Sequence, residues 1–209
     1  MSEGALAFDA ERHEYTLGVR RLPSVTEILR PVSMFEYRFV SASVMERAAL
    51  LGSATHALIE LDIAGTLDED ALDDSLRPYL ASWRQFRAQS GFVPVLSEAR
   101  VHSRRYGFAG TLDLFGVMND SPTLIDAKRT AQVPRSAGPQ TAAYQIALRE
   151  SRPEAIADAI ELGVVGMNIM RFALHLTPGR WQLVPFRNPN DQRVFLSALT
   201  IHNYMEKAA

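Results

Sequence analysis

The sequence contains no cysteine among its 209 residues. Disulfide bonds, zinc sites built on thiolates and iron–sulfur clusters ligated by cysteine are therefore excluded. A metal ion bound by this chain must take its ligands from oxygen atoms or from imidazole nitrogens.

Long apolar runs are also missing, and residues 1–9 lack the basic and then apolar pattern of a secretory signal. These two absences predict a cytoplasmic protein with no membrane span. We find no internal repeat, low-complexity tract or interdomain linker. Since 47% of the residues are hydrophobic, we expect one domain over residues 1–209 with a core of its own.

The chain has no excess of positive charge. It contains 22 Lys and Arg residues against 24 Asp and Glu residues, and its formal net charge is −2. The molecule as a whole is therefore not a polycation, which weighs mildly against nucleic acid. A nucleic-acid partner would have to be held by a local basic surface and by metal ions.

Two segments with strand-like composition lie on either side of the turn-forming residues 119–122. A two-residue turn centred on residues 119 and 120 would place Asp113 opposite Asp126 in an antiparallel hairpin. Lys128 follows Asp126 by two residues, so both side chains project from the same face of their strand. We therefore expect two carboxylates and one ammonium group to lie together.

Two carboxylates held this close repel each other, and a divalent cation bound between them removes the repulsion. The lysine beside them can orient a water molecule and stabilise negative charge on a phosphate. This pattern predicts metal-dependent phosphodiester hydrolysis. A short Asp-x-Lys pattern also occurs by chance in surface hairpins, where the side chains are solvated or paired across strands. The prediction therefore depends on the neighbouring segments.

A third carboxylate, Glu98, lies in the alternating segment 93–102 that precedes the Asp113 strand. A turn centred between Arg104 and Arg105 would pair residue 98 with residue 111, on the face that carries Asp113. Glu98 would then join the two aspartates, provided that no bulge changes the parity. The alternative is an isolated glutamate that faces solvent.

His56 lies in residues 35–63, whose apolar residues recur at the three- and four-residue spacing of one long amphipathic helix or of two joined helices. His56 and Glu60 are one helical turn apart on one face. The imidazole is a candidate metal ligand or phosphate contact, with Glu60 orienting the ring. Alternatively, His56 lies at a helix–strand contact with its nitrogens satisfied by backbone groups.

The segment 129–139 is a basic loop interrupted by proline, with Arg129 and Arg135 and no acidic residue. It can contact phosphates or be solvated surface, and the sequence favours neither. The helix that follows presents Gln140 and Tyr144 on one face. A glutamine amide beside a tyrosine ring suits phosphate and base contacts, although an ordinary helix surface would have the same composition.

The remaining segments predict the framework around these residues. In chain order we expect a hairpin over residues 5–22, a short helix that starts at Ser24 and is stopped by Pro31, a helix that opens with the acidic run 68–74 and continues to Ser90–Gly91, a hairpin with its turn at Pro178–Gly179, and a closing helix over about 190–207. We assign no chemistry to the acidic run, because acids at a helix start complement the helix dipole.

Taken together, these elements resemble the motif set of the PD-(D/E)XK nuclease superfamily in order and approximate spacing, over about residues 22–150. The matching elements are Gly52-x-x-x-His56, Glu98, Gly110-x-x-Asp113, Asp126-x-Lys128 and Gln140-x-x-x-Tyr144. The upstream histidine and the Gln-x-x-x-Tyr element are similar to the RecB-like branch, which includes phage exonucleases, and the segment 22–29 resembles the start of phage and prophage members.

The resemblance implies an α/β fold with a restriction-endonuclease-like core, in which helices flank a mixed central β-sheet. It also implies that Asp113 and Asp126 are direct ligands of Mg²⁺ or Mn²⁺. The carbonyl of Ala127, Glu98 and His56 are candidates for the remaining positions. Some relatives carry a cysteine-ligated iron–sulfur cluster, which this chain cannot build.

The same resemblance implies that Lys128 positions the attacking water and that Gln140 and Tyr144 hold substrate DNA. It suggests a bacterial or phage-encoded exonuclease in DNA recombination, repair or phage DNA processing, with a recombination, helicase or annealing protein as a partner. Two alternatives remain: a catalytically silent DNA- or partner-binding module on the same scaffold, and a hydrolase of small phosphate esters. The complete set of two aspartates and a lysine argues against the first, and the lack of a phosphate-binding glycine loop argues against the second.

Overall fold

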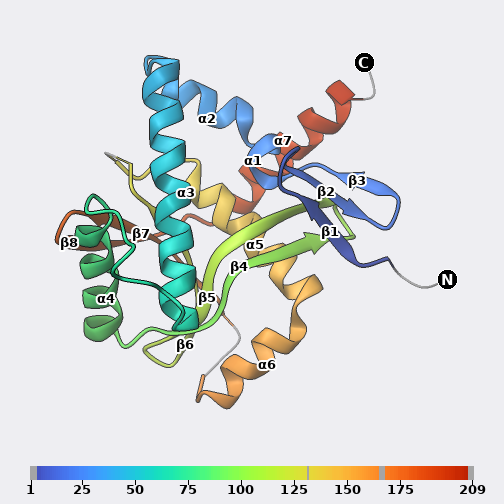
Figure 1. The fold of residues 1–209 in the computed structure, drawn as a ribbon. Helices are drawn as coiled ribbons and strands as arrows, with labels where there is room; N and C mark the ends of the chain where they lie inside the picture. Colours follow the sequence, from blue (N-terminus) through green and yellow to red (C-terminus); the bar gives the residue numbers. More distant parts are fainter. Residues whose placement is uncertain (1–3, 131, 165–167, 207–209) are drawn as a thin grey trace.

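The computed structural model describes residues 4–130, 132–164 and 168–206. Its helices and strands, drawn in Figure 1, are β1 (Leu6–Asp9), β2 (Glu14–Leu17), β3 (Arg20–Leu22), α1 (Val25–Ile28), α2 (Arg30–Tyr37), α3 (Ala42–Ala64), α4 (Arg77–Ser90), β4 (Val93–Ser103), β5 (Phe108–Met118), β6 (Ser121–Lys128), α5 (Ala137–Ser151), α6 (Pro153–Glu161), β7 (Met170–Thr177), β8 (Arg180–Pro185) and α7 (Asp191–Glu206).

The central sheet has five strands in the order β4-β5-β6-β7-β8. The β6–β7 pair is parallel and the other pairs are antiparallel. The parallel connection from β6 to β7 runs through α5 and α6, as a parallel pair requires a long crossover. The mixed α/β fold predicted from the sequence is therefore confirmed.

The hairpin of β5 and β6 has the register expected from its turn. Leu114 pairs with Ile125, and Met118 pairs with Ser121 at the end of the ladder. The two turn residues Asn119 and Asp120 both have positive φ angles, 48° and 54°, as a two-residue hairpin turn of type I′ requires. This register places residue 113 across from residue 126.

The β4–β5 connection is longer than predicted, because residues 104–107 all belong to the turn. Arg100 therefore pairs with Thr111, and Ala99 pairs with Leu112. The predicted partner of residue 98, residue 111, was therefore wrong by two positions. Because two is an even number, Glu98 still lies on the face of the sheet that carries Asp113. Glu98 itself has φ 45° and interrupts the regular ladder opposite Asp113.

Helices cover both faces of the sheet (Figure 1). On one face α3 and α4 pack with Leu58, Trp83 and Phe86 against apolar residues of β5 to β7. On the other face α1, α5 and α7 enclose a second cluster that includes Phe108 and Phe195. The described residues contain no helix that is long and apolar enough to cross a membrane.

The N-terminal residues form more than the expected hairpin, since β3 adds a third strand in the order β1-β2-β3. Ser24 caps α1 with the predicted capping box: its hydroxyl accepts from the backbone N–H of Glu27, whose carboxylate accepts from the N–H of Ser24. Pro31 does not end the helical segment as predicted. It lies in the first turn of α2, where proline is tolerated because that N–H has no partner.

Two further helix boundaries differ from the predictions. The acidic run 68–74 forms turns before α4, which begins only at Arg77; the Asp68 carboxylate accepts from the N–H groups of Asp70 and Ala71. The helix α6 was not predicted. The closing helix α7 was predicted, although its expected last residue, Lys207, lies outside the described residues.

A buried ion pair ties α5 to the sheet and to α7, and we call it the α5 anchor. Arg171 of β7 donates at 3.0 Å to Asp191 at the start of α7. The same guanidinium donates to the carbonyls of Gly138 and Phe186 and to the hydroxyl of Thr141. The Arg171 charge is therefore surrounded by the Asp191 carboxylate and three neutral acceptors.

Candidate active site

The predicted chemical residues meet where the middle of β5 and the end of β6 lie between α3 and α5. Five of them form what we call the site cluster: His56 from α3, Glu98 from β4, Asp113 from β5, and Asp126 and Lys128 from β6. Asp113 and Asp126 are buried, with exposed fractions of 8% and 1%. Buried acids require partners or a bound cation.

His56 joins α3 to both hairpins. Its Nδ1 lies 2.9 Å from Glu98 Oε1 and 3.6 Å from Asp113 Oδ1, while its Nε2 lies 3.2 Å from the Ala127 carbonyl oxygen. The proposed contact with Glu60 was wrong: Glu60 is exposed, and both ring nitrogens already have other partners. The structure therefore brings His56, Glu98 and Asp113 together as the sequence predicted.

Asp113 also bridges the two strands, because its Oδ2 accepts a hydrogen bond of 2.7 Å from the N–H of Ala127. One ligand atom from each of His56, Glu98 and Asp113 lies within 4.8 Å of the others. A nitrogen and two carboxylate oxygens at this separation fit a divalent cation. Asp126 is not part of this group of three, although the resemblance to the nuclease superfamily implied that it is a direct metal ligand.

Asp126 is instead paired with Lys128. The lysine Nζ lies 2.9 Å from each carboxylate oxygen but donates a hydrogen bond only to Oδ1. Among the described residues, no group donates a hydrogen bond to the buried Oδ2. The Lys128 ammonium group partly balances that oxygen, and a bound cation would add the remaining compensation that a buried anionic oxygen needs. The donor set therefore fits a divalent metal ion.

The pKa values reflect the crowding of acids in this site. The nearby Asp113 carboxylate raises the pKa of His56 to about 9, so the imidazole favours the cationic form. Burial raises the pKa of Asp126 to about 6 although Lys128 acts in the opposite direction, and burial also raises the pKa of Asp113. Three carboxylates thus share one lysine and one histidine, which leaves an excess of negative charge.

Gln140 and Tyr144 lie next to the site cluster. Gln140 Oε1 is 3.5 Å from Lys128 Nζ, and its Nε2 is 3.4 Å from the Tyr144 hydroxyl. Tyr144 is only 4% exposed, so it does not form the open helix surface that the sequence suggested. Its ring fills the space beside Gly110, where an added Cβ would lie 2.8 Å from Tyr144 Cε1. Gly110 is thus needed for this close approach.

The two arginines expected to contact DNA lie in different surroundings. Arg129 stacks on the ring of Tyr79, with Cζ 3.8 Å from the ring centroid, and donates from Nη1 to the carbonyl of Leu51. The side chain of Arg135 is exposed before α5, and its backbone N–H donates to Glu36 of α2. Only Arg129 is held in a defined position next to the site.

A cleft of about 820 Å³ opens onto the site cluster. It is lined by His56, Glu98, Asp113 and Lys128 on one side and by Phe8 and other residues of the N-terminal sheet on another. From the sequence, the hairpin over residues 5–22 was expected to be a lid or an edge element, and its residues border the cleft. The only sequence signal was the alternation of apolar residues, which predicts strands but not their position.

The comparison with protein families gives the class of the protein. A model of the PD-(D/E)XK nuclease superfamily matches residues 38–195. This match covers most of the chain, and it includes the site cluster, the parallel strand β7 and the α5 anchor. The chain belongs to the PD-(D/E)XK nuclease superfamily, whose members use divalent metal ions.

Two solved structures were among those similar to this chain. One is LHK-Exo in complex with dAMP, with 14% identity, a TM-score of 0.34, and coverage of 90% of this chain and 88% of the other. The second is the alkaline exonuclease LHK-Exo from Laribacter hongkongensis, with 15% identity, a TM-score of 0.29, and coverage of 88% and 91%. No curated protein sequence matches the chain.

Proposed function

We propose that residues 1–209 form a single nuclease domain that hydrolyses DNA phosphodiester bonds with the help of Mg²⁺ or Mn²⁺. The observation that carries this proposal is the site cluster, in which three carboxylates are gathered around one lysine and one histidine at the bottom of an open cleft. A binding site for DNA alone would be weakened by this negative charge, because DNA is itself an anion.

In this proposal His56 gives up its proton when the metal ion binds, and His56, Glu98 and Asp113 hold the ion. Asp126 Oδ2, which accepts no hydrogen bond among the described residues, and the carbonyl of Ala127 complete the ligand set. The bound cation would neutralise charge on the scissile phosphate and the leaving oxygen, and would make water a stronger nucleophile at neutral pH. The N–H of Ala127 fixes the Asp113 carboxylate. Asp126 keeps the Lys128 side chain in place.

Lys128 has two tasks in the same proposal. Its ammonium group orients the attacking water, and its charge stabilises the negative charge that develops on the phosphate. Burial lowers the pKa of Lys128, but the carboxylates of Asp126 and Asp113 outweigh burial and the net shift is upward. Lys128 therefore remains protonated and acts as a donor and a charge. It does not act as a general base.

Gln140 is placed to contact the substrate phosphate or the water, since its amide lies within reach of Lys128. The Tyr144 hydroxyl accepts from the side-chain amide of Gln140 and helps to orient it. Arg129 and Arg135 supply positive charge for the DNA backbone. We further propose an exonuclease that works in the cytoplasm in DNA recombination, repair or phage DNA processing. The similarity of His56 and of the Gln140-x-x-x-Tyr144 element to the RecB-like branch supports this narrower assignment.

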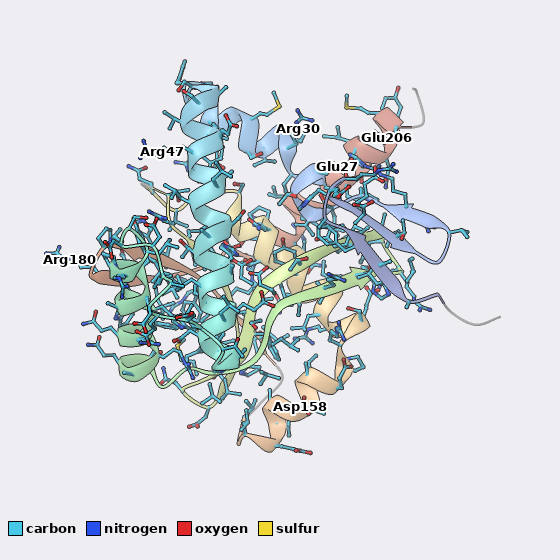
Figure 2. All side chains as sticks on the ribbon, in the orientation of Figure 1. Glu27, Arg30, Arg47, Asp158, Arg180 and Glu206 are labelled. Carbon is cyan, nitrogen blue, oxygen red and sulfur yellow. The ribbon has the colours of Figure 1, made fainter. Side chains whose placement is uncertain are left out.

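The first test is digestion of end-labelled linear DNA in Mg²⁺ or Mn²⁺ by the wild type and by the Asp113→Ala and Lys128→Ala variants. We expect cleavage by the wild type and almost none by the two variants. The matched control is Asp158→Ala, because Asp158 is an exposed carboxylate on α6, far from the site cluster (Figure 2). Equal digestion by all variants would place the activity elsewhere.

The second test separates metal binding from chemistry. In calorimetric titration with Mn²⁺, Asp113→Ala should lose binding, whereas Lys128→Ala should retain it because removal of a cation leaves the site more negative. DNA binding by a wild type that binds no Mn²⁺ would favour a silent binding module. End-blocked and circular DNA substrates then distinguish exonuclease from endonuclease cleavage.

A further inference from the structure

A second groove lies on the other side of α3 from the cleft. Its volume is about 450 Å³, and it lies between the first half of α3, Tyr79 and residues 127–130. Arg47 projects from α3 on this side, away from the N-terminal sheet (Figure 2). The cleft and the groove share Gly52, His56 and Lys128, so they meet at the site cluster.

The groove differs from the cleft in charge. Three carboxylates, those of Glu60, Glu98 and Asp113, line the cleft together with the cations Arg100 and Lys128. Within the described part of the chain, the lining of the groove includes the cations Arg47, Lys128 and Arg129 but no Asp or Glu. In a chain whose net charge is −2, such a surface attracts an anion.

Arg129 is already held in a geometry suited to a phosphate. Its guanidinium stacks on Tyr79, and among the described residues its one protein acceptor is the Leu51 carbonyl, 3.3 Å from Nη1. No described carboxylate forms an ion pair with Arg129 or with Arg47. A guanidinium fixed by stacking keeps its other N–H groups for a phosphate, and little side-chain entropy is lost when it binds one.

Gly52 lies where the cleft and the groove meet, because it lines both of them. A Cβ added at this residue would meet no atom within 4 Å. Glycine inside a helix is less favourable than alanine by about 0.5–1 kcal/mol. Packing therefore does not require glycine here, and a large side chain at this residue would enter the open space beside the cleft and the groove.

We propose that this cationic groove binds the sugar–phosphate backbone of the DNA strand beyond the scissile phosphate, on the side opposite the cleft. The inference rests on the proposed nuclease function and extends it. The strand is held on both sides of the bond that is cut, by the cleft on one side and by Arg47, Tyr79 and Arg129 on the other. A substrate too short to cross Gly52 cannot reach these three residues.

Binding without cleavage tests the groove directly. Fluorescence anisotropy in EDTA, with a single-stranded oligonucleotide of about 12 nucleotides, reports binding whether or not the protein is a nuclease. We expect Arg47→Ala and Arg129→Ala each to weaken binding about tenfold, and to reduce the slope of log K against log salt by about 0.7 for each phosphate that the variant no longer neutralises. The control Arg193→Ala removes an exposed arginine of α7 and should change neither value. Unchanged binding by both groove variants would overturn the proposal.

Steady-state cleavage separates a binding role of the groove from a structural one. On the oligonucleotide, both groove variants should raise KM about tenfold. On bis(p-nitrophenyl) phosphate, which is too small to reach the groove, Arg47→Ala should have the same kcat/KM as the wild type. Arg129→Ala does not serve this comparison, because Arg129 also contacts the Leu51 carbonyl of α3. An equal reduction on both substrates by Arg47→Ala would overturn the proposal.

Filling the junction gives an independent result. Gly52→Leu should reduce oligonucleotide cleavage at least tenfold while the far-ultraviolet circular dichroism remains that of the wild type. Full activity of this folded variant would overturn the proposal that the DNA strand passes Gly52 from the cleft into the groove. Failure of the wild type to cleave any substrate with Mg²⁺ or Mn²⁺ would contradict the proposed function, whereas the anisotropy experiment would still decide whether the groove binds DNA.

Discussion

The molecule contains two groups of buried charges that are satisfied to very different degrees. In the α5 anchor, one arginine and one aspartate balance each other, and Arg171 has four acceptors. In the site cluster, three carboxylates face one lysine and one histidine, and one oxygen of Asp126 has no hydrogen-bond donor among the described residues. The anchor is complete without a ligand, whereas the site cluster is built for an additional cation.

This contrast predicts opposite effects when one aspartate in each group becomes neutral. A complete pair is destabilised because the remaining charge is left buried without its partner. A crowded set of like charges is relieved of repulsion, although it loses its function. Neutralising Asp191 in the α5 anchor should therefore reduce stability more than activity, and neutralising Asp113 in the site cluster should reduce activity more than stability. Four predictions test this contrast, in order of decreasing expected effect.

Asp113→Asn should have the largest effect, a loss of about 10³-fold in cleavage rate. A metal ligand and the charge stabilisation that depends on it contribute several kcal/mol to the transition state. The asparagine oxygen can still accept from the N–H of Ala127, so the fold is retained. In metal-free buffer, thermal unfolding should give a Tm no lower than that of the wild type. A much lower Tm would mean that Asp113 is primarily a structural residue.

Asp191→Asn should reduce the free energy of unfolding by about 3–5 kcal/mol, because it leaves the Arg171 charge buried without a counterion. Urea unfolding followed by circular dichroism measures this loss. The cleavage rate of the folded fraction should stay within a few-fold of the wild type, since Asp191 contacts no residue of the site cluster in the described structure. A loss of activity without a loss of stability would contradict the distinction between the two groups.

Addition of Mn²⁺ at one hundred times its Kd should raise the free energy of unfolding of the wild type by about 2.7 kcal/mol. Asp191→Asn should show the same increase from a lower starting value, because its site cluster is intact. Asp113→Asn should show almost no increase. Differential scanning fluorimetry with and without EDTA provides the comparison, and an equal shift in all three proteins would place the metal elsewhere.

Tyr144→Phe should have the smallest effect, about 1 kcal/mol or less in stability. The hydrogen bond to Gln140 that it removes is long, at 3.4 Å, and a typical hydrogen bond contributes only about 1 kcal/mol net. Burial raises the pKa of the Tyr144 hydroxyl well above its ordinary value, so the group stays neutral and its removal leaves no charge behind. Cleavage should fall only a few-fold. A reduction comparable to that of Asp113→Asn would give this hydroxyl a direct catalytic role.

The sequence predicted most of the site because alternation along strands is strict. The Asn119–Asp120 turn determines which residue lies opposite Asp126, and the structure has that register. Glu98 was placed on the correct face although the turn after β4 was predicted too short. The error was two residues, and a shift by an even number does not move a side chain to the other face.

The sequence could not predict contacts between segments that are far apart. Helical spacing placed His56 and Glu60 on one face. It could not show that the carboxylate of Glu98, 42 positions later, would interact with Nδ1 of His56. The stacking of Arg129 on Tyr79 joins the loop after β6 to the first turn of α4, and no local pattern indicates a contact between segments 50 positions apart. The start of α4 was placed too early because acidic residues favour turns as well as helix N-termini.

The position of β6 in the sheet has a consequence for how the protein is made. The strand that carries Asp126 and Lys128 is central, and its outer neighbour, β7, is a parallel strand that begins only at Met170. A ribosome will thus have translated more than 40 further codons after Lys128 before that strand has its second partner. The sheet that positions Asp126 and Lys128 is therefore complete only after synthesis has passed the crossover.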